Sequence, residues 1–137
     1  MRALPHSLAS ALAKRLNALM PAGFVLTAED EWLELFIEGR FDGTLSAPQR
    51  VDDEAADLGA ELEIAVYEVL DGLQDAVAEH LRAPWPSLDG HNMALPQVRR
   101  TGESIQLWYG DAESDPVLAI PEIPFAEIEV APSSRLT

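Results

Sequence analysis

The stretch DDEAADLGAELEIAVYEVLDGLQDAVAEHL, which runs from Asp52 to Leu81, contains no Lys or Arg. Its apolar side chains recur every three or four residues, the spacing of one helix face, at Leu58, Leu62, Ala65, Val69, Leu73 and Ala76. Its acids fall on the opposite side, at Asp57, Glu61, Glu68, Asp75 and Glu79. The pattern predicts one long amphipathic helix that ends before Pro84 and exposes a row of carboxylates.

This central helix is expected to form because it packs, since its own sequence weakens it. Acids four residues apart repel each other by a few tenths of a kcal/mol per pair. Burial of each large apolar side chain contributes roughly 1.5 to 3 kcal/mol, which outweighs that repulsion. Gly59 and Gly72 lower the helix propensity further, and they indicate places where another part of the chain approaches the helix closely.

Further elements are predicted on both sides of the central helix. An apolar stripe, Leu8, Leu12, Leu16 and Leu19, predicts an N-terminal helix over about 5–19. Strand patterns and turn signals predict strands at 24–27, 31–38, 97–100, 104–109 and 117–120, and the total becomes six if 40–46 also forms one. This order predicts an α+β fold in which the N-terminal helix and the long central helix pack on one face of an antiparallel sheet of about five to six strands. Residues 1–130 are expected to form a single domain, and 131–137 a flexible C-terminal tail.

The charge of the chain makes several kinds of partner improbable. With 24 acids against 9 Lys and Arg, its formal net charge is −15. Binding to nucleic acid depends on Lys and Arg that neutralise phosphates, so we expect no nucleic-acid partner and no anionic membrane partner. No run of about 18 apolar residues could span a membrane. The absence of cysteine excludes disulfides and thiolate metal sites, and a cytoplasmic location is the expectation that remains.

No catalytic, metal-binding or nucleotide-binding motif stands out in the sequence. Asp89 and His91, in the loop that follows the central helix, are the nearest approach to an acid–base pair. Rows of acids on the helix could ligate a hard cation, but a solvated acidic face explains them equally well. We therefore expect no cofactor and no metal, and a hydrolase or metal enzyme centred on Asp89 and His91 is kept only as an alternative.

Large aromatic side chains occur on strand faces that are otherwise polar. In 31–38, Trp32 and Phe36 share the face opposite the aliphatic residues, and Trp108 does the same in 104–109. If the aliphatic faces pack on the helices, these aromatics lie on the outer face of the sheet, which is typical of a protein interface. The alternative is that the chain covers them itself, with the loop Pro84-Trp85-Pro86.

Parts of the chain resemble known groups of proteins. The stretch from Ala11 to Phe24, the stretch from Leu73 to Pro86, and Leu107-Trp108-Tyr109-Gly110-Asp111 followed by Pro116-Val117-Leu118 resemble small, acidic, uncharacterised proteins of high-GC actinobacteria. That resemblance implies no activity. The order of helices and strands also resembles that of type III secretion chaperones, and this analogy implies a dimer that binds partner proteins.

These observations favour a non-enzymatic protein-binding module, similar to a chaperone or adaptor, that forms a homodimer. Its partner surface is expected to combine aromatic residues with the acids of the central helix: Trp32, Phe36, Trp85, Trp108, Asp57, Glu61, Glu68, Asp75 and Glu79. The main alternative is an acidic immunity protein or nucleic-acid mimic that neutralises a basic partner.

Overall fold

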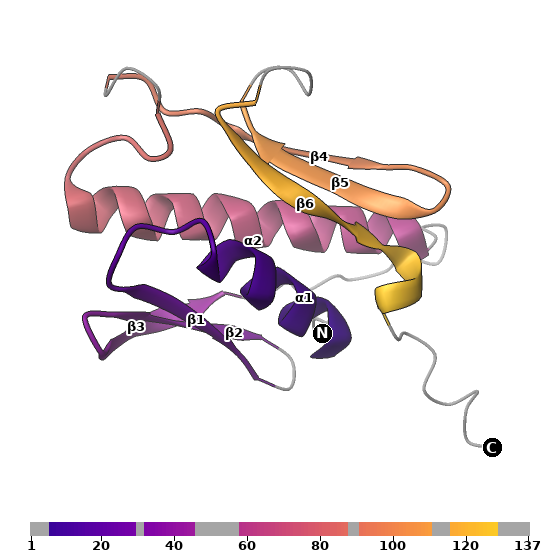
Figure 1. The fold of residues 1–137 in the computed structure, drawn as a ribbon, viewed down its shortest axis with the longest axis horizontal. Coiled ribbons are helices and arrows are strands. Elements are labelled where there is room, and N and C mark those ends of the chain that lie inside the picture. Colours follow the sequence, from indigo (N-terminus) through magenta and orange to yellow (C-terminus); the bar gives the residue numbers. More distant parts are fainter. Residues whose placement is uncertain (1–5, 30–31, 46–57, 88–90, 111–115, 129–137) are drawn as a thin grey trace.

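The computed structural model describes residues 6–29, 32–45, 58–87, 91–110 and 116–128 of the chain (Figure 1). Its elements are, in order, α1 (His6–Asn17), β1 (Phe24–Ala28), β2 (Leu33–Ile37), β3 (Arg40–Leu45), α2 (Leu58–Leu81), β4 (Pro96–Arg100), β5 (Ser104–Tyr109), β6 (Leu118–Pro124) and a short 3-10 helix, η1 (Phe125–Glu127). The predicted α+β class is confirmed, with strands at all six expected places. The start of the central helix at 52–57 and the tail predicted at 131–137 lie outside the described residues.

The six strands form two sheets, whereas the sequence predicted one. The first sheet has the antiparallel order β1-β2-β3, and the second has the antiparallel order β4-β5-β6. The two helices lie between the sheets, with α2 running along the length of the molecule (Figure 1). Each sheet turns an apolar face toward the helices, so helices that were expected to cover one sheet instead support two from opposite sides.

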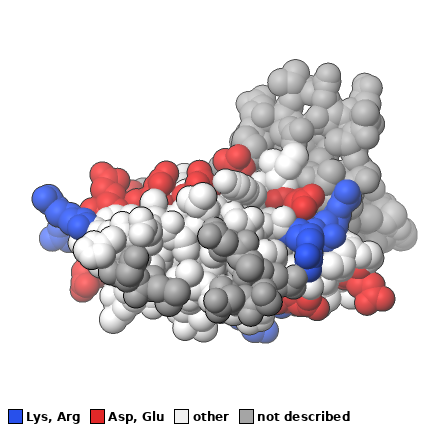
Figure 2. All heavy atoms as spheres, turned by 90° about the horizontal axis from the view of Figure 1, so that it is seen from above, with Lys and Arg blue, Asp and Glu red and all other residues white. Residues whose placement is uncertain are grey.

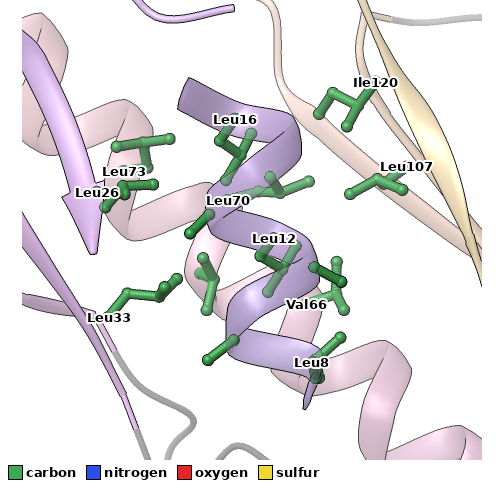
Figure 3. Packing of buried hydrophobic residues seen from close by; sticks show 14 of the residues in the cluster. Leu8, Leu12, Leu16, Leu26, Leu33, Val66, Leu70, Leu73, Leu107 and Ile120 are labelled. Atoms are coloured by element: carbon green, nitrogen blue, oxygen red, sulfur yellow. The ribbon is translucent and has the colours of Figure 1, made fainter. Parts of the chain in front are cut away.

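The hydrophobic core lies where the two helices meet both sheets (Figure 3). Fully buried leucines come from α1 and α2, and buried aliphatic side chains from the inner faces of the sheets surround them: Leu8, Leu12, Leu16, Leu70 and Leu73 from the helices, and Leu26, Leu33, Leu35, Ile105 and Leu107 from the strands. Each contributes roughly 1.5 to 3 kcal/mol when removed from water. This packing explains why α2 forms despite its row of acids.

Gly72 of α2 lies against the first sheet. A Cβ atom built at Gly72 would stand 3.0 Å from the Cδ2 atom of Leu45, the last residue of β3. A larger side chain there would require the side chain of Leu45 to move by a few tenths of an ångström. The close contact at this glycine is made by a side chain, whereas the glycine had been expected to mark a close approach of backbone.

Two buried polar side chains connect α2 to the second sheet. The hydroxyl of Tyr109, which is fully buried, donates a hydrogen bond of 2.8 Å to the backbone oxygen of Leu70. The amide of Gln74 donates to the backbone oxygen of Ala94, just before β4. Burial, reinforced by the negative charge of Asp71, raises the pKa of Tyr109 above its ordinary value.

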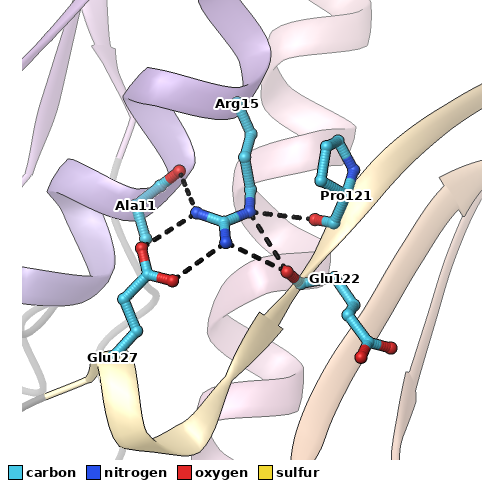
Figure 4. Close-up of polar contacts among 5 residues, drawn as sticks. All are labelled: Ala11, Arg15, Pro121, Glu122 and Glu127. Carbon is cyan, nitrogen blue, oxygen red and sulfur yellow. Dashed lines mark hydrogen bonds and ion pairs between the residues drawn. The ribbon is translucent and has the colours of Figure 1, made fainter.

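Arg15 joins α1 to the C-terminal end of the second sheet (Figure 4). Its guanidinium donates to the backbone oxygens of Pro121 and Glu122, both at 3.0 Å, and to that of Ala11 at 3.2 Å. It also holds both carboxylate oxygens of Glu127, at 2.9 and 3.0 Å. The hydrogen bond from Arg15 is the main reason why the pKa of Glu127 is lowered.

Replacing Tyr109 by Phe should lower the free energy of unfolding by about 1 kcal/mol, because it removes one buried hydrogen bond and keeps the ring. The matched control is Tyr67→Phe, at a tyrosine of α2 that is exposed. Urea unfolding measures both variants. Equal stabilities for the two variants would contradict a role for the Tyr109 hydroxyl in joining helix and sheet.

The raised pKa of Tyr109 also predicts that the stability difference between the wild type and Tyr109→Phe depends on pH. Because the pKa of Tyr109 is raised in the folded state, the folded protein holds this proton more tightly than the unfolded chain does. The stabilisation is complete below the ordinary tyrosine pKa of about 10 and is lost as the pH rises above it. Between about pH 10 and 12, the wild type should therefore lose stability relative to Tyr109→Phe.

Arg15→Gln should lower the free energy of unfolding by about 1 to 2 kcal/mol, since several charge-assisted hydrogen bonds are lost at a partly exposed site. Lys14→Gln removes the same charge from the neighbouring, exposed residue and is the control. Part of the stabilisation by Arg15 comes from its ion pair with Glu127. This part is fully present above the ordinary glutamate pKa of about 4.3, and it is lost as the pH falls through the lowered pKa of Glu127 in the folded protein. A stability difference that does not narrow in acid would argue against the ion pair.

Candidate protein-binding surface

The structure does not bring the three predicted outer aromatics together. Trp32 and Phe36 belong to the outer face of the first sheet, while Trp108 lies on the outer face of the second sheet. The two sheets flank the helices from opposite sides, so their outer faces point away from each other (Figure 1). The expectation of one shared aromatic face depended on a single sheet and has to be corrected.

An apolar row crosses the outer face of the first sheet. Val25 of β1 pairs directly with Phe36 of β2, and Phe36 pairs with Phe41 of β3. The rings of Phe36 and Phe41 meet edge to face, with their centres 5.8 Å apart. Val25 and Phe41 are 48% and 57% exposed. Contiguous apolar side chains of this exposure often mark an interaction site.

Trp32 lies on the same side of the sheet, just before β2, and is separated from this row by Glu34. Its side chain is 37% exposed, and its indole nitrogen donates a hydrogen bond of 3.2 Å to the carboxylate of Glu34. We call Val25, Trp32, Phe36 and Phe41 the first-sheet surface. The sequence had indicated Trp32 and Phe36 only; the alternation around Val25 was the signal that could have added Val25, whereas Phe41 faces outward because of the register shift between β2 and β3.

Trp108 is more enclosed than the residues of the first-sheet surface. The guanidinium of Arg99 lies 5.9 Å from the centre of its ring and also donates to the side-chain oxygen of Gln106. The indole nitrogen of Trp108 is buried and has no hydrogen-bond partner among the described residues. Neighbouring strands of the same sheet thus cover much of this side chain, which makes it a weaker candidate for a binding surface.

Trp85 does not cover the outer aromatics. Its ring lies 5.6 Å from that of Tyr109 and meets it at 61°, and Tyr109 belongs to the inner face of the second sheet. The half-buried Trp85 therefore closes one side of the core, beyond the end of α2. The loop reaches this place because Ala94 donates a backbone hydrogen bond of 2.9 Å to Pro86, which joins the two ends of the loop.

The acidic face of α2 is present as predicted where the structure describes its side chains. Glu68, Asp75 and Glu79 are exposed, while the side chains of Asp57 and Glu61 lie outside the described residues. Figure 2 shows Asp and Glu atoms in a row along one edge of the molecule, with Lys and Arg gathered toward the two ends. This row leaves an extended negative surface that a basic partner could approach.

Two large side chains interrupt the acidic face of α2. Ile64 and Tyr67 are 38% and 40% exposed, and they stand beside Leu95 and Val98 at the edge of the second sheet. Together these residues line an open groove of about 440 Å³. Sequence reasoning missed this groove because Ile64 and Tyr67 fall outside the apolar face of the helix and were given no role.

The alternative chemical site has little geometric support. Asp89 lies outside the described residues, and His91 is exposed. Within the part of the chain that the structure describes, no group of three or more His, Asp or Glu side chains could hold a metal ion. None of the described helices is both long enough and apolar enough to cross a membrane.

Comparison with known proteins gives no guide to function: no protein-family model, curated protein or solved structure matches the chain significantly. The resemblances to actinobacterial acidic proteins and to type III secretion chaperones therefore stay predictions. What can be argued about function depends on the surfaces described above.

Proposed function

We propose that this chain is a non-enzymatic protein-binding module and that the first-sheet surface is its contact surface. The observation that supports this proposal is the row Val25, Phe36 and Phe41, which crosses three paired strands and leaves Val25 and Phe41 exposed on either side of the half-buried Phe36. Aromatic side chains at the centre of an interface often contribute most of its binding energy. A partner that covers this row would remove a large apolar area from water.

The surroundings of the row suit an interface rim. Thr27, Glu34 and Thr44 form the polar row next to it on the same face, because they pair with one another across the three strands. Interfaces commonly combine an apolar centre with such a polar rim. Four apolar side chains alone cover less than the roughly 800 Å² per partner of a stable interface, so the rim has to take part in binding.

A second copy of the chain is the partner that we propose first, in keeping with the predicted homodimer. Two first-sheet surfaces related by a twofold axis would each supply the same apolar row to the other. Sheets packed face to face lie about 10 Å apart, which leaves room for interdigitated side chains such as Phe41. A chaperone- or adaptor-like role would follow from binding other proteins in addition to this copy.

Phe41→Ser should shift the dimer toward monomer by at least tenfold in dissociation constant, as expected for a central aromatic residue. Trp32→Ala should weaken association less, because Trp32 lies beyond the polar row, away from Val25, Phe36 and Phe41. Leu81→Ser is the control, since Leu81 is exposed at the end of α2, outside the first-sheet surface. Light scattering over a range of concentrations measures the mass, and a wild type that stays monomeric would reject the homodimer.

The acidic face of α2 favours a second candidate function, the neutralisation of a basic partner. α2 has no Lys or Arg along its whole length, and Glu68, Asp75 and Glu79 are exposed on it. An immunity protein or a nucleic-acid mimic would use such a face to attract a basic surface over long range. This function would depend on the arrangement of the charges as well as on their number.

Changing Glu68, Asp75 and Glu79 together to Gln, Asn and Gln should weaken binding to polylysine more than a control triple variant does. The control neutralises three exposed acids outside α2, namely Asp42, Glu103 and Glu122, and so changes the net charge equally. Binding of the wild type should fall steeply as the salt concentration rises. Equal losses for the two triple variants would show that only net charge matters and would reject this candidate.

A further inference from the structure

One edge of the second sheet has backbone groups that point away from the sheet. The sheet order places β4 at the edge, with β5 on one side only. The backbone oxygen of Leu95 accepts from Gly110 at 2.9 Å, and the N–H of Thr101 donates to Ser104 at 2.8 Å. Alternate residues of an antiparallel strand point to the same side, so Gln97 and Arg99 also face β5. Pro96 and Val98 consequently turn their backbone groups outward.

The groove beside α2 runs along this open edge. It is lined by Ile64 and Tyr67 from the helix and by residues 95–98, which precede and form the first part of β4. Pro96 is buried and Val98 is half-buried, and among the described residues no backbone hydrogen bond links the outward N–H or oxygen of Val98 to another segment. An added strand could therefore pair with β4 while its side chains enter the groove. Such strand addition is a common way for proteins to bind extended peptides.

The charges around the groove indicate which kind of added strand would bind there. Glu63 is the one charged residue in its lining, and the exposed Glu68 and half-buried Asp71 follow it along α2. Arg99 lies on the other face of the sheet, over the ring of Trp108. A second copy would bring its own acidic α2 and a net charge of −15 to this place, whereas a basic segment would meet opposite charges.

We propose that the open edge of β4 and its groove bind an extended, basic segment of another protein, which adds a strand to the second sheet. Its apolar side chains would contact Ile64, Tyr67 and Leu95, and its Lys or Arg side chains would lie near Glu63 and Glu68. Val98 would donate one backbone hydrogen bond to the segment and accept another. This site is separate from the first-sheet surface, so it does not depend on the proposed function.

The test uses a fluorescently labelled seven-residue peptide of alternating Lys and Val, blocked at both ends, and measures its anisotropy with the whole chain. Val98→Pro removes the outward N–H and leaves the bonds to β5 in place, as proline is tolerated at such edge positions. This variant and Tyr67→Ala should each weaken binding about five- to tenfold. Phe41→Ser, in the first-sheet surface, and Leu81→Ser should leave binding unchanged.

A second peptide separates strand pairing from charge attraction without changing the protein. Methylation of the peptide nitrogens on alternate residues keeps every charge and removes the donors that would face β4. The methylated peptide should bind at least tenfold more weakly, and a peptide of alternating Glu and Val should not bind. The proposal is overturned if the wild type does not bind the Lys and Val peptide, or if the methylated peptide binds equally well. It is also overturned if Val98→Pro, folded by circular dichroism, instead converts a dimer to a monomer, because a second copy would then occupy the edge.

Discussion

The packing of α2 against both sheets at once is the constraint on which the rest of this structure depends. A helix that supports a single sheet needs only a narrow apolar stripe, but α2 buries Leu62, Val66, Val69, Leu70 and Leu73 along a broad one. Two hydrogen bonds connect α2 to the second sheet, one made by Tyr109 and one by Gln74. On the side of the first sheet, the side chain of Leu45 packs closely against Gly72. With one helix shared in this way, the outer faces of the sheets have to point in opposite directions. The surfaces proposed to bind partners are therefore distributed over the molecule.

Periodicity was sufficient to predict the elements and the direction of most side chains. Apolar residues three or four apart in 58–81 identified α2 and most of the residues that it buries. Alternation in 31–38 placed Leu33, Leu35 and Ile37 inward and Trp32 and Phe36 outward, as the structure has them. These features depend on neighbours within one element, and for that reason a single sequence contains them. The acids Glu68, Asp75 and Glu79 were predicted to be exposed by the same reasoning.

Features that depend on contacts between distant parts of the chain could not be predicted in this way. Strand patterns do not say which strands pair, so six strands in two sheets look the same in sequence as six strands in one. The direction of Trp85 was missed because its partner, Tyr109, is brought to it only by the path of the loop after α2. The groove at Ile64 and Tyr67 depends on where β4 runs, and the row through Phe41 depends on a register shift between β2 and β3 near Phe36.

The guanidinium of Arg15 has a consequence for how the molecule comes apart. The residues that it joins are separated by 106 to 112 positions, so it connects the first described helix to the last described strand and turn. Since the two sheets share no hydrogen-bonded strand pair, they could in principle separate along the helix layer. Arg15 joins α1, in that helix layer, to β6 and η1 at the end of the second sheet. Unfolding of α1 or of the end of β6 breaks these contacts, so Arg15 favours unfolding of the two ends of the described chain together.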